Sequence, residues 1–205
     1  MAPKPTTVDT DTELSAVNAI LGSIGQSPVA QIDHENPEIS FIYNILTEVN
    51  KDVQTEGWAF NVERGIAETP DSNKNILIPN NVLSIDSYPP EDRTLDLVIR
   101  NGKLYDRVDH TDEFSGDVKV TKVWLWEYEE LPTVFKRYIV HKASARAAIQ
   151  LVSNPQLVQM LAAQEALSRA SCLEYECNQG DYSYFGTPQN THYTSYKPYH
   201  SLARR

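Results

Sequence analysis

The spacing of apolar residues changes twice along this chain, and this change limits the folds open to it. Apolar residues recur at three- and four-residue steps from 14 to 24 and from 39 to 53, which is the period of an amphipathic helix. Between 61 and about 128 they form short runs bounded by Pro, Asn and Gly, as strands do. Helical spacing returns at 131. Helices on both sides of a strand-rich stretch indicate the α+β class.

The expected helices have typical end signals. Thr10 and Glu13 have the spacing of a capping box, and Gly25 ends the first helix. The second helix begins at Pro37, because Pro is tolerated in a first turn, and it ends at Gly57.

Two more helices are expected in the second half of the chain. The third runs from Pro132 to Val152, and Asn154-Pro155 restarts the chain as a fourth helix that continues to about Tyr184. We expect the four to form an antiparallel four-helix bundle. Its expected core residues are Leu14, Val17, Leu21, Ile39, Ile42, Leu46, Val49, Leu161 and Leu167.

The strand-rich stretch is expected to form a small antiparallel β-sheet domain inserted between helices 2 and 3. Strands are predicted at 76–78, 82–85, 95–99 and 118–124, and Asn101-Gly102 is a strong signal for a two-residue hairpin turn. The expected domains are 1–60 and 129–185 for the two parts of the bundle, 61–128 for the β domain, and 186–205 for an extended C-terminal docking tail.

The charge is uneven. The chain carries a net charge of −10, but residues 186–205 carry +3, so residues 1–185 carry −13. An acidic body argues against a nucleic-acid reader, which needs clustered Lys and Arg. A basic, Tyr-rich tail indicates either a docking segment or a disordered end. The expected docking residues are Tyr193, Tyr196, Tyr199, Arg204 and Arg205.

The sequence predicts no catalytic, cofactor-binding or metal-binding residues. The five histidines are scattered, and Cys172 and Cys177 have no zinc-site spacing, which favours buried thiols acting as small hydrophobes. We expect neither a signal peptide nor membrane insertion, because apolar runs of the required length do not occur. Synthesis in a reducing cytoplasm is expected.

Acidic clusters near two tryptophans leave one enzymatic alternative open. Sugars stack on aromatic rings and two carboxyl groups share proton transfer in glycan hydrolases. On a protein of this acidity, a solvated acidic face is the preferred interpretation. The residues concerned are Asp106, Asp109, Asp112, Glu113, Glu127, Glu129 and Glu130, beside Trp124 and Trp126.

An ordered set of segments from about residue 12 to 185 resembles tail tubular protein A of short-tailed, podovirus-type bacteriophages. The matching segments are Glu13–Leu21, Ser23–Gly25, Pro28-Val29, Gly57–Asn61, Leu104–Arg107 with Phe114, Pro132, Phe135, Arg137–Val140, Lys142–Ser144 and Cys172–Glu176.

The resemblance implies a structural virion protein that is not an enzyme and has no cofactor. It implies a homo-oligomeric ring, a dodecamer, that sits below the portal protein as a head-to-tail adaptor. The ring would carry the nozzle made of tail tubular protein B, help to attach the tail fibre protein, and line the DNA ejection channel. A channel for DNA should repel phosphates, which agrees with the acidic body. A glycan hydrolase and a tail-assembly chaperone remain the alternatives.

Overall fold

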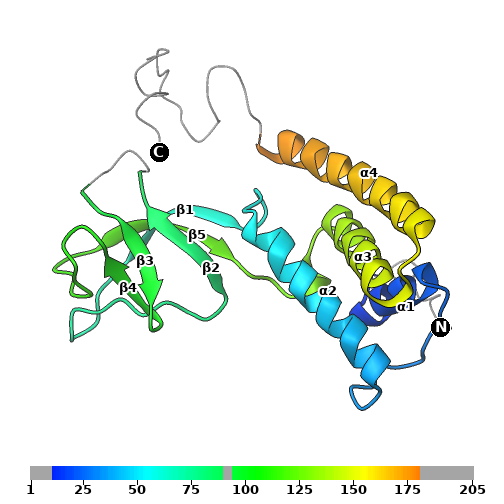
Figure 1. Cartoon of the computed structure of the whole chain (residues 1–205). Coiled ribbons are helices and arrows are strands. Elements are labelled where there is room, and N and C mark those ends of the chain that lie inside the picture. Colours follow the sequence, from blue (N-terminus) through cyan, green and yellow to red (C-terminus); the bar gives the residue numbers. More distant parts are fainter. Residues whose placement is uncertain (1–10, 90–93, 181–205) are drawn as a thin grey trace, which may run out of the picture.

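The computed structural model describes residues 11–89 and 94–180. This part of the chain has four α-helices, a three-stranded antiparallel sheet and a two-stranded antiparallel sheet, so the fold is α+β (Figure 1). The helices are α1 (Glu13–Ser23), α2 (Pro37–Thr55), α3 (Thr133–Ala147) and α4 (Pro155–Gly180). The strands are β1 (Val62–Glu68), β2 (Val82–Ser87), β3 (Leu97–Arg100), β4 (Lys103–Asp106) and β5 (Val118–Trp124).

The first two helices begin at side-chain caps. The Thr12 hydroxyl accepts a hydrogen bond from the Ser15 N–H at 3.3 Å and so starts α1. The expected capping residue, Thr10, lies outside the described residues. The Asn36 side chain accepts from the Glu38 N–H at 3.1 Å, and the second helix begins at Pro37 as predicted. Among the helices of the described residues, none is both long and apolar enough to cross a membrane.

The third helix extends to Val152 as predicted, but its last turn is not α-helical. α3 ends at Ala147 and continues as a π-helical turn, Ala148–Val152, before Ser153 adopts a left-handed φ of 53°. This residue reverses the chain, so that α4 starts at Pro155 and returns along α3 (Figure 1). The predicted end of the fourth helix, near Tyr184, lies outside the described residues.

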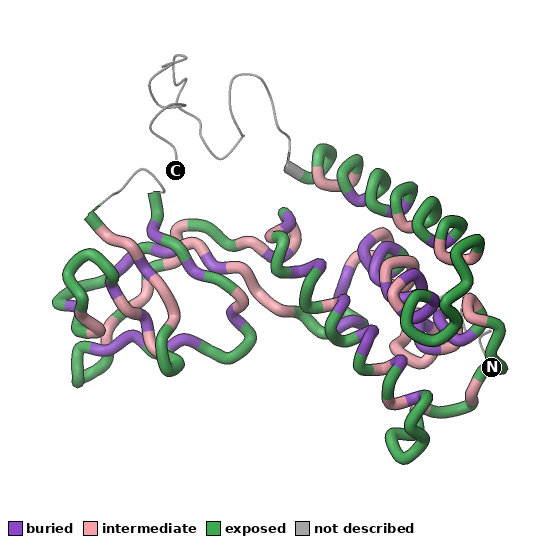
Figure 2. The backbone as a smooth tube through the Cα atoms, in the orientation of Figure 1, coloured by how far each residue is buried: buried purple, intermediate pink, exposed green. Residues whose placement is uncertain are grey.

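The helical core is built mainly by α1, α2 and α3, whereas α4 contributes only Cys172 to its buried residues. α3 contacts the other three helices. Figure 2 shows buried positions on the facing sides of these helices and a largely exposed α4. The predicted antiparallel four-helix bundle is therefore not confirmed, because α4 adds only one buried residue to the core that the other helices share.

The structure places the expected core residues unequally. Leu14 is half-buried, and Leu161 is buried in a small separate cluster with Ala145 and Ala148. Leu167 is 72% exposed, so its assignment to the core is wrong; it is on the side of α4 that faces away from α3. The remaining expected core residues are buried in the helical core: Val17, Leu21, Ile39, Ile42, Leu46 and Val49.

The strands form two sheets instead of one. The first has the order β1-β5-β2, and the second is the hairpin β3-β4. Asn101 and Gly102, with φ of 52° and 71°, make the hairpin turn at the predicted position. The predicted strand at 76–78 pairs with the hairpin as an isolated antiparallel bridge, Leu77 to Lys103. Two backbone hydrogen bonds of 2.9 Å flank the bridge, from the Ile78 N–H to the Gly102 carbonyl and from the Leu104 N–H to the Ile76 carbonyl.

A second hydrophobic core lies between the two sheets and the 76–78 segment. Its central residues are fully buried, including Ile76, Leu104 and Val120. None of its members belongs to the helical core. The described residues thus form two main cores, and Figure 1 shows the strands on one side of the molecule and the helices on the other.

The helical core should depend strongly on Leu46, which is 2% exposed. Leu46→Ala leaves a cavity and removes buried apolar area, so the free energy of unfolding should fall by about 2–5 kcal/mol. Thermal and denaturant unfolding measure this loss. Leu77→Ala is the matched control, since Leu77 is 64% exposed and should change stability little. Equal stability of both variants would contradict this assignment of the core.

Candidate functional site

Two buried amide side chains connect the end of α2 to the three-stranded sheet. Gln54 is in the last turn of α2 and is fully buried, and Asn61 comes directly before β1 and is 1% exposed. Buried amides are costly unless every polar atom has a partner. We call the region that these two residues hold together the joint.

Gln54 binds the chain that leaves the sheet. Its Nε2 donates to the Trp126 carbonyl at 2.9 Å, and its Oε1 accepts from the Trp126 N–H at 2.8 Å. The same Nε2 donates to Asn50 Oδ1 at 2.9 Å. The side-chain amide of Gln54 therefore makes both hydrogen bonds that a neighbouring strand would make to the Trp126 backbone.

Asn61, in the connection that leads from α2 into β1, makes the remaining hydrogen bonds of the joint. Its Nδ2 donates to the carbonyl oxygens of Gln54, at 2.9 Å, and Trp124, at 2.8 Å. Its Oδ1 accepts from the Trp58 N–H at 2.8 Å. Within the described residues, each buried side-chain nitrogen and oxygen has a hydrogen-bond partner. The joint is fully satisfied, so rotation of the sheet about it would break several hydrogen bonds at once.

Aromatic rings connect the joint to the centre of the helices. The Trp58 Nε1 donates to the Val53 carbonyl at 2.8 Å, and its ring packs edge-on against Phe135 of α3 at 5.0 Å between centroids. Phe135 also packs against Phe60, at 4.6 Å, and against Tyr175 of α4, at 5.7 Å. One fully buried residue of α3 thus contacts both the joint and α4.

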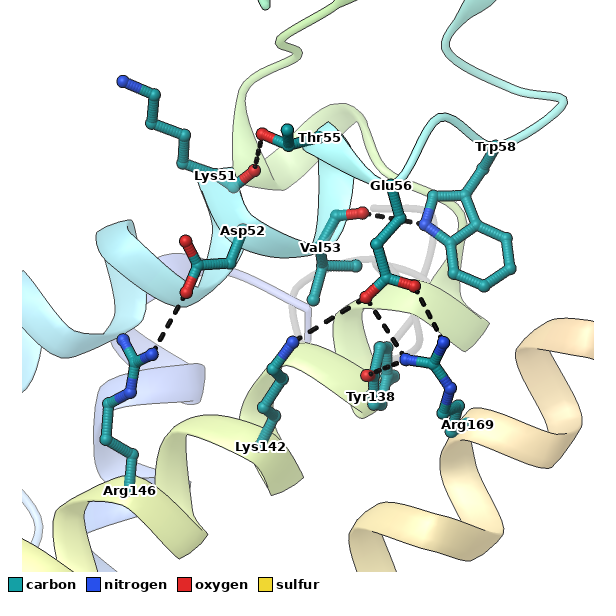
Figure 3. Close-up of polar contacts among 10 residues, drawn as sticks. All are labelled: Lys51, Asp52, Val53, Thr55, Glu56, Trp58, Tyr138, Lys142, Arg146 and Arg169. Carbon is teal, nitrogen blue, oxygen red and sulfur yellow. Dashed lines mark hydrogen bonds and ion pairs between the residues drawn. The ribbon is translucent and has the colours of Figure 1, made fainter. Parts of the chain in front are cut away.

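An ion-pair cluster joins α2, α3 and α4 (Figure 3). The Glu56 carboxylate accepts from Arg169 of α4, with 3.0 Å between Nη2 and Oε2, and lies 3.8 Å from the Lys142 ammonium of α3. Arg169 also donates to the Tyr138 hydroxyl at 2.8 Å. The hydrogen bond to Glu56 is the main reason that the pKa of Arg169 is raised above its usual value.

A second part of the cluster lies one turn further along α3. Arg146 Nη1 is 3.3 Å from Glu48 of α2. Its Nη2 is 3.1 Å from Asp52, also on α2 (Figure 3). These side chains are partly exposed to solvent, so each pair contributes at most about 1 kcal/mol to stability. The cluster therefore contributes little to the free energy of unfolding, and its main effect is on how α2, α3 and α4 are oriented.

α4 is attached by few buried contacts. Ser168 Oγ lies 3.1 Å from His141 Nδ1, and Glu176 Oε2 accepts from the Ala59 N–H at 2.8 Å. Cys172 is buried and its Sγ lies 3.6 Å from the Val134 carbonyl. Cys177 is exposed, so the prediction that both thiols are buried is wrong for this residue.

The acidic clusters do not form one site. Asp106 is 1% exposed, and its Oδ1 accepts from the N–H groups of Asp96, at 3.2 Å, and Val108, at 2.9 Å, which shapes the loop after β4. Glu129 belongs to a 3₁₀ helix, Tyr128–Glu130, whose Tyr128 is buried in the other core. Within the described residues, no group of His, Cys, Asp and Glu is arranged to hold a metal ion.

Sequence reasoning missed the joint, although it named Asn61 within a matching segment. The available signal was a polar residue, Gln54, next to the last apolar residue of the α2 stripe, Val53. The expected docking residues lie outside the described residues; they are Tyr193, Tyr196, Tyr199, Arg204 and Arg205.

Removing one amide should weaken the joint measurably. Asn61→Ala leaves two carbonyl oxygens and the Trp58 N–H without their partner, and leaving a buried group unpaired costs about 1–3 kcal/mol. Denaturant unfolding should show this loss. Asn44→Ala, at an exposed position of α2, is the control and should be nearly neutral. An unchanged midpoint for Asn61→Ala would refute a structural role of the joint.

The two thiols should differ in reactivity. Burial raises the pKa of the Cys172 thiol to about 11, so at pH 8 about one molecule in a thousand carries the reactive thiolate at this position. A thiol reagent should therefore modify one cysteine rapidly in the folded protein and two in denaturant. Cys177→Ser should abolish the rapid reaction. Two rapidly reacting thiols in the folded wild-type protein would mean that α4 does not stay on α3.

Comparisons with known proteins agree on one family. Residues 14–182 match the model of the family described as Tail tubular protein. The chain is also 27% identical over 135 residues to Tail tubular protein A of Klebsiella phage KP34, a match that covers 65% of this chain and 70% of that protein. The family match spans most of the chain, including both cores and the joint. The chain therefore belongs to the tail tubular protein family, whose members are structural components of phage tails.

Proposed function

We propose that this chain is the subunit of an adaptor ring between the portal and the tail nozzle. The observation that carries the proposal is the family match over residues 14–182, together with the similarity to a protein named Tail tubular protein A. A tube requires many copies of a subunit that keeps its shape. The joint supports this requirement, because it fixes the helices and the sheet in one orientation.

The proposed partners are the portal protein, the nozzle protein (tail tubular protein B), the tail fibre protein and further copies of this chain. We take the ring to be a dodecamer. It is made in the host cytoplasm and becomes part of the virion tail. The body charge of −13 supports a DNA channel that does not bind DNA by sequence, because an acidic wall repels phosphates.

The C-terminal segment is the proposed docking element. Residues 186–205 have no acidic residue and carry +3, so they complement an acidic surface on a partner. Tyr side chains offer large contact area with few rotatable bonds, which suits an anchor. Tyr193, Tyr196 and Tyr199 are the proposed anchors, and Arg204 and Arg205 the proposed charged contacts. In domain terms, 1–60 and 129–185 would form the helical part and 61–128 the β part.

Native mass spectrometry and co-sedimentation with the cognate portal test the proposal. The full chain should form a closed ring, of about twelve copies, that sediments with portals. A chain ending at residue 185 should keep its melting temperature but bind portals at least about tenfold more weakly, since buried Tyr anchors often contribute 2 kcal/mol or more.

A matched triple variant separates the tyrosines from the rest of the segment. Tyr193, Tyr196 and Tyr199 changed together to Ala should reproduce the effect of the truncation. Gln189, Thr194 and Ser195 changed together to Ala should bind portals normally. A truncated chain that binds portals like the full chain would rule out the docking role, and a full chain that forms no ring would rule out the adaptor.

A further inference from the structure

The outer side of α4 carries several large apolar residues although it faces away from the other described helices. Met160, Leu167 and Leu173 are exposed by 66%, 72% and 48%. Ala163 and Ala170, also exposed, lie between them on the same side of the helix, seven residues apart. A helix that is apolar on its inner and outer sides is typical of one buried on both sides.

This surface continues over the turn that precedes α4. Ile149, Leu151 and Val152 of the π-helical turn are exposed by 57%, 44% and 39%. We call the six exposed large apolar residues of the turn and the helix the α4 face: Ile149, Leu151, Val152, Met160, Leu167 and Leu173.

The α4 face adjoins a neutral region of an otherwise acidic molecule. From 147 to 164 the sequence contains no Asp, Glu, Lys or Arg, and the same holds from 14 to 32. The structure brings these two stretches together, because Ile24 packs against the cluster that contains Leu157 and Leu161. The exposed side of α2, in contrast, carries charged side chains: Glu38, Glu48, Lys51 and Asp52.

We propose that the α4 face binds a neighbouring copy of this chain and forms the subunit contact of the ring. Two copies that each carry −10 repel each other, so their contact is most favourable where acidic side chains are absent. Four of its residues, Ile149, Leu151, Val152 and Met160, lie in the stretch without charged side chains and meet that condition. Leu167 and Leu173 add apolar area beside the exposed Arg169 and Glu174. This inference rests on the proposed ring and adds the side of the subunit that closes it.

The size of the surface suits this partner. A helix of 26 residues is about 39 Å long and roughly 10 Å wide, which gives about 400 Å² in projection. The side chains and the 149–152 turn enlarge this area towards the ~800 Å² per partner of a stable interface. In a ring the α4 face meets a different side of its neighbour, because a face that meets its own copy gives a two-fold dimer instead.

A charged side chain introduced at the centre of the α4 face tests the proposal. Leu167→Glu places a carboxylate in the expected contact, so the subunit concentration at half-assembly should rise at least about tenfold. Leu77→Glu is the matched control, because Leu77 is exposed to a similar extent in the strand-rich part. Native mass spectrometry measures the ring fraction, and thermal unfolding checks that each variant is folded. Met160→Glu is a second, independent variant of the face.

The alkylation rate of Cys177 tests the same contact in the wild-type protein, without any substitution. Cys177 is exposed and lies seven residues beyond Ala170, on the same side of α4. Its alkylation should be at least about tenfold slower in the ring than in the dissociated subunit, because a packed neighbour excludes the reagent.

The possible outcomes separate this inference from the adaptor proposal. Rings in wild-type and Leu77→Glu protein, with weakened rings in Leu167→Glu and Met160→Glu, support the inference. Normal rings in both face variants, or equal alkylation of Cys177 in ring and subunit, overturn it and leave the adaptor intact. In that case residues 181–205 of the same chain, or another tail protein, would cover α4. A wild-type chain that stays monomeric even with portals overturns both.

Discussion

The hydrogen bonds of Gln54 and Asn61 determine how the two cores of this molecule are placed relative to each other. Without them, the described residues would link the helices and the sheet mainly by two short connections, around 56–61 and 125–127, and by the hydrogen bond from the Trp124 N–H to the Asn61 carbonyl. Both amides are almost completely buried, and most of their partners are backbone groups: those of Trp58 and Trp126 in the connections, the Gln54 carbonyl at the end of α2 and the Trp124 carbonyl at the end of β5. An alternative orientation would leave these groups without partners in a dry environment, so the joint selects one orientation.

The contacts that connect the joint to α3 and then to α4 are less buried the further they lie from the joint. Phe135 carries the packing from Trp58 to α3 and on to Tyr175 of α4. Beyond this aromatic contact, α4 is held by three buried residues, Leu161, Ser168 and Cys172, and by partly exposed ion pairs such as Glu56–Arg169, which salt screens. Among the helices of the described residues, α4 therefore has the smallest buried share. This property agrees with a helix that gains further support from a neighbour in an assembly.

The sequence alone was sufficient for the fold class and for most helix ends. The α2 start at Pro37 and the hairpin at Asn101-Gly102 follow from local chemistry, which a single sequence displays directly. Leu167 was misassigned because a hydrophobic stripe does not say which side of a helix meets the core when both sides are apolar. The 76–78 run pairs with the hairpin as a short bridge, and its Ile76 and Ile78 side chains fill the second core, whereas Leu77 is exposed.

The joint was beyond reach for a different reason. Asn61 and Trp124 are far apart in the sequence, and a buried amide looks like any surface amide until its partners are known. A single-particle reconstruction by electron cryomicroscopy of the ring on its portal tests the rigid joint most directly. The helices and the three-stranded sheet should keep the orientation seen in the single chain, with the Gln54–Trp126 pairing intact. A sheet rotated about 56–61 and 125–127, with this pairing broken, would contradict a rigid subunit.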